Sequence, residues 1–98
     1  MYYKSFYHTL SESEIMEAIQ KSGFNPIRIC DDPNYVYQPH SHPETKLLVF
    51  LKGAMKIRVG SEIFHCTVGD KLIIPGGVEH SAKVGKHGCE FLWSEKMI

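Results

Sequence analysis

Beyond Pro26, glycine and proline divide the chain into short apolar segments at regular intervals, and this division limits the fold more than any other feature. Residues 55–59 alternate between apolar and basic side chains, which is the pattern of a strand with one buried face. The dipeptide Gly60-Ser61 is a two-residue hairpin turn before the returning segment 62–68. Short strands with such punctuation predict an all-β sandwich or barrel.

The segment 46–51 differs from its neighbours because apolar side chains occupy both of its predicted faces. We therefore expect a central strand that is covered on both sides and ended by Gly53. An aromatic segment at residues 1–9 is a weaker strand candidate, which could pair with a sheet edge of its own chain or of a partner. The other predicted strands are residues 27–30, 35–38, 71–74, 80–84 and 89–93.

One helix precedes the barrel strands. Ser11 and Glu14 have the spacing of a capping box, in which each residue bonds to the backbone of the other. An apolar stripe at helical spacing follows, so we predict a helix over residues 12–21. We expect residues 1–26 to form an N-terminal extension whose helix packs on a barrel made of residues 27–98.

The charge balance excludes two classes of partner. Lys and Arg together number 11, and so do Asp and Glu, so we expect neither nucleic acid nor an anionic membrane surface to bind. No apolar run approaches the ~20 residues that a membrane helix needs, and the first residues lack the apolar core of a signal peptide. The three cysteines match neither a disulfide framework nor a zinc-ribbon spacing. We expect a cytoplasmic protein with reduced cysteines.

Three histidines form the candidate site. His40 and His42 are two residues apart on a predicted extended segment, so both imidazoles can point to one place. His80 follows a Pro-x-Gly-x-x-His turn far along the chain. Neutral imidazoles that converge from two strands can hold a first-row transition metal. A thiol from Cys66 or Cys89 could join them only if its strand faces the barrel interior.

These residues resemble the two motifs of the cupin superfamily, whose members are small double-stranded β-helix or jelly-roll barrels. In the first motif, two His one residue apart are followed by a Glu and then by a Gly. Here His40, His42 and Gly53 agree with that pattern, but Lys46 stands where the family has Glu. The sequence therefore departs from the family at one of the four positions that usually bind the metal.

The second motif lies in the later part of the chain. It agrees at Gly69, Pro75, Gly77 and His80, with Val84 in place of the final Asn. The resemblance implies an all-β jelly-roll barrel with a short N-terminal helix. It also implies a divalent transition metal, Fe, Mn, Ni or Zn, bound by His40, His42 and His80.

Lys46 has the strand parity of the first two histidines and should face the cavity. Its protonated ammonium has no lone pair and cannot ligate a cation. It could pair with Glu44 or Glu79 and leave a three-histidine site, bind an anionic group of a substrate, or fill the site so that no metal binds. Glu44 shares the same parity and could be a displaced fourth ligand, although a turn-exposed carboxylate is the simpler interpretation.

Three functions are consistent with these residues. The first is a metal-dependent enzyme of the dioxygenase or isomerase type, acting on a small organic acid or keto/enol compound, with Lys46 as a catalytic or orienting group. The second is a non-catalytic module that binds a small molecule or a metal. The third is a metal-free barrel whose histidines are remnants. Barrel edges and the aromatic N-terminal segment further predict a homodimer.

Overall fold

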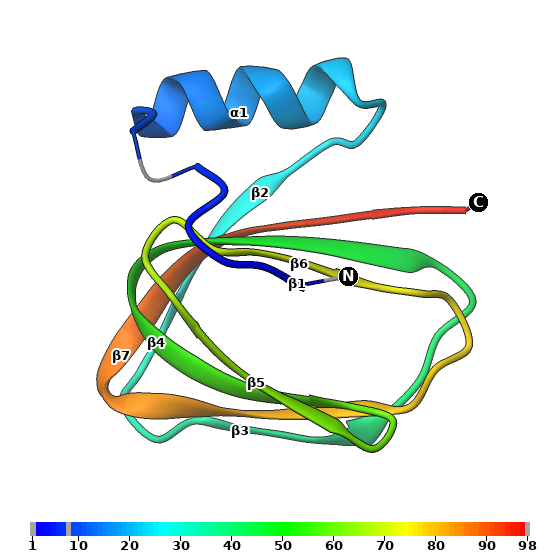
Figure 1. Cartoon of the computed structure of the whole chain (residues 1–98). Helices are drawn as coiled ribbons and strands as arrows, with labels where there is room; N and C mark the ends of the chain where they lie inside the picture. The colour runs from blue at the N-terminus through cyan, green and yellow to red at the C-terminus, as the bar shows by residue number, and fades with distance from the viewer. Residues whose placement is uncertain (1, 8, 98) are drawn as a thin grey trace.

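The computed structural model describes residues 2–7 and 9–97 (Figure 1). This part of the chain holds one helix and seven strands. They are β1 (Tyr2–Tyr3), α1 (Glu12–Lys21), β2 (Ile27–Asp31), β3 (Val36–His40), β4 (Thr45–Val59), β5 (Glu62–Thr67), β6 (Lys71–Ile74) and β7 (His80–Lys96). Met1 and His8, which belong to the predicted strand at residues 1–9, lie outside the described residues.

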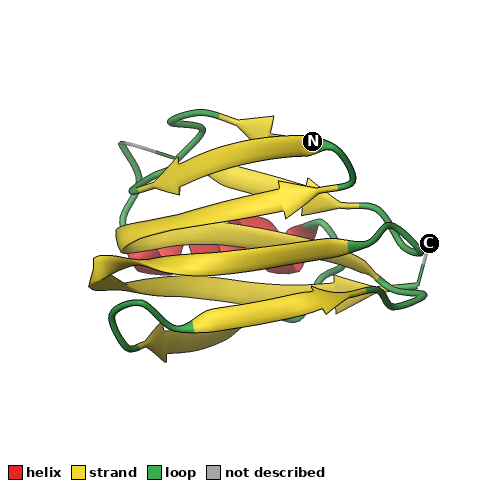
Figure 2. Cartoon of the chain, turned by 90° about the horizontal axis from the view of Figure 1, so that it is seen from below, coloured by secondary structure: helices red, strands yellow, loops and turns green. Residues whose placement is uncertain are grey.

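Strands β4 and β7 organise the barrel because each runs through both of its layers (Figure 1). In one layer the antiparallel order is β1-β6-β4-β7-β2. In the other layer β5 pairs with β4 and β3 pairs with β7. Seen from below, these strands lie in front of the helix (Figure 2). The result is an antiparallel jelly-roll barrel with one short helix, as the sequence predicts.

The length of β4 and β7 contradicts two predicted strand ends. Gly53 was expected to end a strand, but β4 continues through it with a shift of register on each side. Likewise, the separate strands predicted at 80–84 and 89–93 are parts of β7. Both strands bend at the point where Gly53 of β4 approaches Gly88 of β7, and the φ angles of these glycines are 75° and 80°. A Cβ on Gly53 would lie 2.0 Å from the Gly88 carbonyl oxygen. Glycine here permits a bend and a close backbone approach instead of a strand end.

Helix α1 covers the outside of one layer, as expected. Its buried side chains, Ile15 and Ile19, pack on Leu47, Val49 and Leu92 of the sheet. The intervening residues of β4 point into the barrel, where they join the second and larger apolar cluster. The strand predicted to be covered on both faces is therefore confirmed. None of the described residues forms a helix long and apolar enough to cross a membrane.

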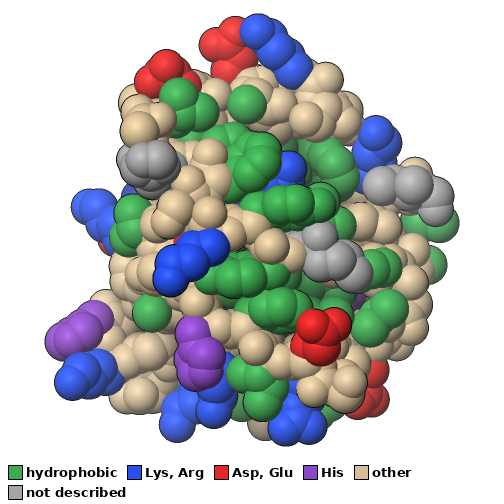
Figure 3. All heavy atoms as spheres, in the orientation of Figure 1, with side chains coloured by type: hydrophobic (Ala, Val, Ile, Leu, Met, Phe, Trp, Pro, Cys, Tyr) green, Lys and Arg blue, Asp and Glu red, His purple; other side chains and the backbone are tan. Residues whose placement is uncertain are grey.

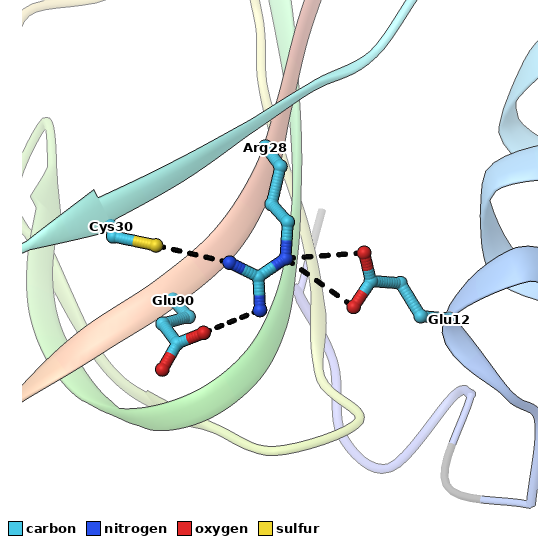
Figure 4. A network of polar contacts seen from close by, with 4 residues as sticks. All are labelled: Glu12, Arg28, Cys30 and Glu90. Atoms are coloured by element: carbon cyan, nitrogen blue, oxygen red, sulfur yellow. Dashed lines mark hydrogen bonds and ion pairs between the residues drawn. The ribbon is translucent and has the colours of Figure 1, made fainter.

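The predicted helix bounds and cap are confirmed. Ser11 Oγ accepts a hydrogen bond from the Glu14 amide at 3.2 Å, and Glu14 Oε1 accepts one from the Ser11 amide at 3.0 Å. Arg28 then joins the helix to the barrel, because its Nε lies 3.1 Å from a Glu12 oxygen while another of its nitrogens contacts Glu90 (Figure 4). These groups are partly exposed, so the ion pairs orient the helix more than they stabilise the fold.

The N-terminal segment forms a much shorter strand than predicted. Only Tyr2 and Tyr3 pair with β6 of the same chain, and Ser5 then takes a positive φ of 54° that an extended strand does not allow. Buried Asp70 holds this turn: its carboxylate accepts hydrogen bonds from the Tyr2 hydroxyl at 2.8 Å and from the Ser5 amide at 2.7 Å. The segment is thus attached to its own barrel.

Candidate metal and ligand site

The three histidines of the sequence motifs meet at the barrel end where β3 and β6 finish and β4 and β7 begin (Figure 1). His40 is the last residue of β3 and lies directly opposite His80, the first residue of β7. His42 follows in the loop that leads to β4. The convergence predicted from residues that lie forty positions apart is therefore present.

The imidazole rings form a compact triangle. Ring centroids are 4.3 Å apart for His40 and His80, 4.8 Å for His40 and His42, and 4.9 Å for His42 and His80. One nitrogen from each ring lies within 4.8 Å of the others. Two nitrogens bound to one metal ion at about 2.1 Å are at most roughly 4.2 Å apart, so only a small side-chain movement is needed for all three to bind.

The loop that carries His42 and the turn before His80 pack closely together, and two glycines make this contact possible. The Gly77 amide donates a hydrogen bond to the His42 carbonyl oxygen at 2.7 Å. A Cβ on Gly76 would lie 2.1 Å from the Pro43 carbonyl oxygen, so this position has no room for a side chain. The Gly76 amide also lies 3.3 Å from Thr45 Oγ1, which can accept its hydrogen. The Pro-x-Gly turn thereby places His42 beside His80.

Hydrogen bonds and burial favour neutral imidazoles with a free ring nitrogen, the form that can bind a metal. His40 Nδ1 contacts the Gln38 carbonyl oxygen and His80 Nδ1 lies 3.0 Å from that of Val78, so an N–H donated there leaves the Nε2 lone pair free. His42 Nδ1 is buried and has no hydrogen-bond partner. Burial lowers the pKa of His42 and of His80, which favours the neutral form that binds metals. This donor set fits a transition metal.

Lys46 faces the cavity, as its strand parity predicts. Its side chain is 6% exposed, and its ammonium lies 4.4 Å from the centre of the Trp93 ring. The carboxylate that it contacts is that of Glu95, which lies opposite it on β7. Neither of the two partners expected from the sequence is used. The positive charge of Lys46 adds to the effect of burial in lowering the pKa of His42.

The remaining candidate ligands lie outside the histidine group. Glu44 is half-buried but supplies no atom to the group, and its charge acts on His42 only by opposing the lowered pKa. Cys66 and Cys89 belong to the inner apolar cluster, where burial raises the pKa of each thiol to about 12. Among the described residues, the metal-capable group contains no thiol.

A cavity of about 400 Å³ adjoins the histidines. His40, His42, His80 and Lys46 all line it, and most of its other walls are apolar. These walls include Ile29, Met55, Ile57, Phe91 and Trp93. Few polar groups that converge at one point of an apolar pocket are typical of a small-molecule site. Neither Trp93 nor Glu95 was predicted as a site residue from the sequence, although both share the inward parity of Phe91 on β7.

Comparison with known proteins agrees with this fold. The family model of the AraC-like ligand-binding domain matches residues 28–95. This match covers both histidine motifs, the whole of β4 and all but the last residue of β7. A search of the curated proteins found no significant match to the sequence.

Three solved structures are similar in fold. A conserved protein of unknown function from Streptococcus pyogenes is 19% identical, with a TM-score of 0.68 over 76% of this chain and 65% of that one. An RmlC-like cupin from Shewanella frigidimarina is 20% identical, with a TM-score of 0.69 over 76% of this chain and 67% of that one. Oxalate decarboxylase from Bacillus subtilis, which has Mn(II) centres, is 22% identical, with a TM-score of 0.67 over 74% of this chain and 20% of that one. Such identities bear on the fold alone. The jelly-roll barrel and the family match together place this chain in the cupin superfamily, as a member of the AraC-like ligand-binding domain family.

Proposed function

We propose that this domain binds a divalent transition metal through His40, His42 and His80, together with a small organic molecule in the adjoining cavity. The observation that carries the proposal is the group of three ligand nitrogens within 4.8 Å of one another at the wall of an apolar cavity. The buried, unpartnered Nδ1 of His42 supports it, because a buried polar atom without a partner is costly unless something binds there.

The metal would be Fe, Ni or Zn, which suit imidazole ligands, or Mn, which prefers additional oxygen ligands. Once bound, it would supply a Lewis acid with open positions for an oxygen of the ligand. The Mn(II) centres of the similar oxalate decarboxylase support a metal of this class. The apolar walls would hold the body of the ligand and exclude water, and the Lys46 ammonium would orient an anionic group.

A binding module is favoured over an enzyme by the position of Lys46. An acid/base catalyst must exchange a proton with the substrate, whereas an ammonium that contacts the Glu95 carboxylate and covers the Trp93 ring is placed to hold an anionic group by charge. The family match to a ligand-binding domain supports the same choice. We expect a small molecule that binds the metal-loaded protein to be recovered with its mass unchanged, as mass spectrometry can show.

A metal-dependent enzyme is the second candidate, of the dioxygenase or isomerase type and acting on a small organic acid or keto/enol compound. It is supported by the three-histidine donor set, which leaves coordination positions for a substrate, and by a buried ammonium in the same cavity. Oxygen consumption or an altered product mass during incubation with such compounds would favour this candidate over the binding module.

Elemental analysis tests the metal. Protein purified without a histidine tag should contain close to one transition metal ion per chain, and His42→Ala should lose it. His65→Ala is the matched control, since His65 is exposed on β5 and outside the group. Wild-type protein that stays metal-free after incubation with Fe, Mn, Ni and Zn salts would contradict the metal site. It would favour the metal-free barrel, in which the histidines are remnants of a former site.

We further propose a cytoplasmic homodimer. The three cysteines are free thiols, which fits a reducing compartment. Apolar side chains reach the surface between α1 and the barrel (Figure 3), and Tyr3, Phe6 and Leu10 of the N-terminal segment are all exposed. Such surface is often covered by a partner subunit. Sedimentation that gives a monomer at micromolar concentration would contradict the dimer.

A further inference from the structure

We infer that Lys46 and Glu95 form a carboxylate-exchange site, in which the carboxylate of a hydrophobic monocarboxylic acid replaces Glu95 at the Lys46 ammonium. The hydrocarbon part of the acid then fills the apolar cavity. This inference rests on the small-molecule half of the proposed function and does not need the metal. It assigns a ligand class to the cavity and a specificity role to two residues outside the histidine group.

The two partners differ in burial, and the difference decides which of them can move. The Lys46 side chain is 6% exposed and the Glu95 side chain is 37% exposed. An ammonium buried in this way needs a counter-charge, because an isolated buried charge is strongly unfavourable. The Glu95 carboxylate can turn into water at little cost, whereas Lys46 cannot leave. A second carboxylate that arrives from the cavity can therefore take the place of Glu95.

Lys46 also faces the cavity in which the acid would lie. It lies on the inner face of β4, and Trp93 beneath it lines the same cavity. An ammonium has three N–H donors, and the contact with Glu95 uses only part of this capacity. A carboxylate in the cavity can thus meet a free donor before Glu95 is released, so exchange does not require a bare buried charge at any stage.

The composition of the walls selects the rest of the ligand. Of the described residues that line the cavity, none is Asp or Glu, and Lys46 is the only lysine or arginine. The apolar side chains offer few partners for hydroxyl groups, so a polyol would lose hydrogen bonds to water without replacement. A volume of about 400 Å³ accepts a molecule of the size of an aromatic acid. One anionic group on an apolar body matches these walls.

Benzoate and its neutral counterpart benzyl alcohol are suitable probes. They are titrated by calorimetry into protein that has been treated with a chelator, so that no metal contributes. Fluorescence gives a second readout, because Trp93 is the only tryptophan of the chain and lines the cavity. We expect benzoate to bind at least about tenfold more tightly than benzyl alcohol, a difference of about 1.4 kcal/mol.

Variants separate the two members of the pair. Lys46→Met should remove the preference for benzoate while benzyl alcohol still binds. Glu95→Gln should strengthen benzoate binding several-fold, because the internal competitor is lost. The exposed ion pair between Lys21 and Glu17, at 3.1 Å on α1, provides the matched control, so Glu17→Gln should change neither affinity. If Lys46→Met fails to fold, as judged by circular dichroism, Lys46→Gln replaces it.

Several results would overturn the inference. Equal affinity for the two probes would do so, as would a preference that persists in Lys46→Met or benzoate binding that weakens in Glu95→Gln. A preference for benzoate that appears only after Zn²⁺ is added would place the carboxylate on the metal, which contradicts the exchange site and leaves the proposed function intact. A preference in metal-free protein supports the exchange site even if His42→Ala shows no loss of metal.

Discussion

The interior of the barrel has two halves that differ in how they are filled. Near the close approach of Gly53 and Gly88, side chains such as Phe50, Cys66 and Val84 are fully buried and pack in one apolar cluster. Near the histidines, the walls enclose about 400 Å³. The same two strands, β4 and β7, run through both halves, so one half can hold the strands in place while the other stays open for a ligand.

The two halves separate residues that determine the stability of the fold from residues that determine binding. In the filled half every inward side chain touches others, and removing one leaves a void. In the open half the inward side chains include histidine, lysine and apolar residues such as Ile29 and Met55, which line the cavity. Substitutions should therefore act on the free energy of unfolding in the first half and on affinity in the second.

The largest effect is expected from Phe50→Ala in the filled half. Phe50 is fully buried, so its truncation should lower the free energy of unfolding by about 3–5 kcal/mol. Ile29→Ala in the cavity wall is the comparison and should cost much less, because Ile29 is only partly buried. Urea denaturation measures both. Equal losses would mean that the cavity is collapsed in solution and that the two halves do not differ.

Two glycines, Gly53 in the filled half and Gly76 beside the histidines, allow the two halves to be compared by the same substitution. Gly53→Ala places a Cβ 2.0 Å from the Gly88 carbonyl oxygen at a positive φ and should cost about 2 kcal/mol or more of stability. Gly76→Ala places a Cβ 2.1 Å from the Pro43 carbonyl oxygen and should displace the loop of His42. We expect it to weaken metal binding about tenfold, a typical effect of disturbing groups behind the ligands. Calorimetric titration with Zn²⁺ and urea denaturation of both variants should give opposite rankings; the same ranking would contradict the separation.

Local patterns were enough to predict much of the fold. The capping box at Ser11 and Glu14 and the hairpin at Gly60 depend on neighbouring residues and appear as expected. The convergence of the histidines was predictable too, from the motif spacing and the Pro-x-Gly turn before His80, although His42 lies in the loop after β3 and not on the expected strand. A glycine such as Gly53, by contrast, can end a strand or bend it, and only the opposing strand decides between the two.

The partner of Lys46 shows the limit of such reasoning. Parity was enough to predict that Lys46 points inward, and the structure agrees. Its partner depends on the register between β4 and β7, which joins residues 49 positions apart in the sequence. No local signal marks that register, so the carboxylates nearest to the motifs were proposed in place of Glu95.

The charge of Lys46 should have a moderate effect on the open half. Restoring the family carboxylate by Lys46→Glu alone would put two carboxylates opposite each other, so the informative variant combines Lys46→Glu with Glu95→Gln. It should tighten Zn²⁺ binding about tenfold, since a nearby positive charge is replaced by a negative one. Lys46→Met is the control and should give a smaller gain. Weaker Zn²⁺ binding in the double variant would mean that Lys46 does not oppose the metal.

The smallest effect should come from ionisation of the cysteine thiols, which does not alter the free energy of unfolding at neutral pH. Cys66 and Cys89 lie in the filled half, and burial raises the pKa of each to about 12, whereas Cys30 is exposed on β2. At pH 8 iodoacetamide should modify Cys30 first and the other two only on unfolding, as mass spectrometry can follow. Above about pH 9 the thiols of the unfolded chain lose their protons before those of the folded chain, so the free energy of unfolding should fall as the pH rises toward 12. Cys89→Ala should flatten that fall, and rapid labelling of all three thiols at pH 8 would show that the filled half opens as readily as the cavity.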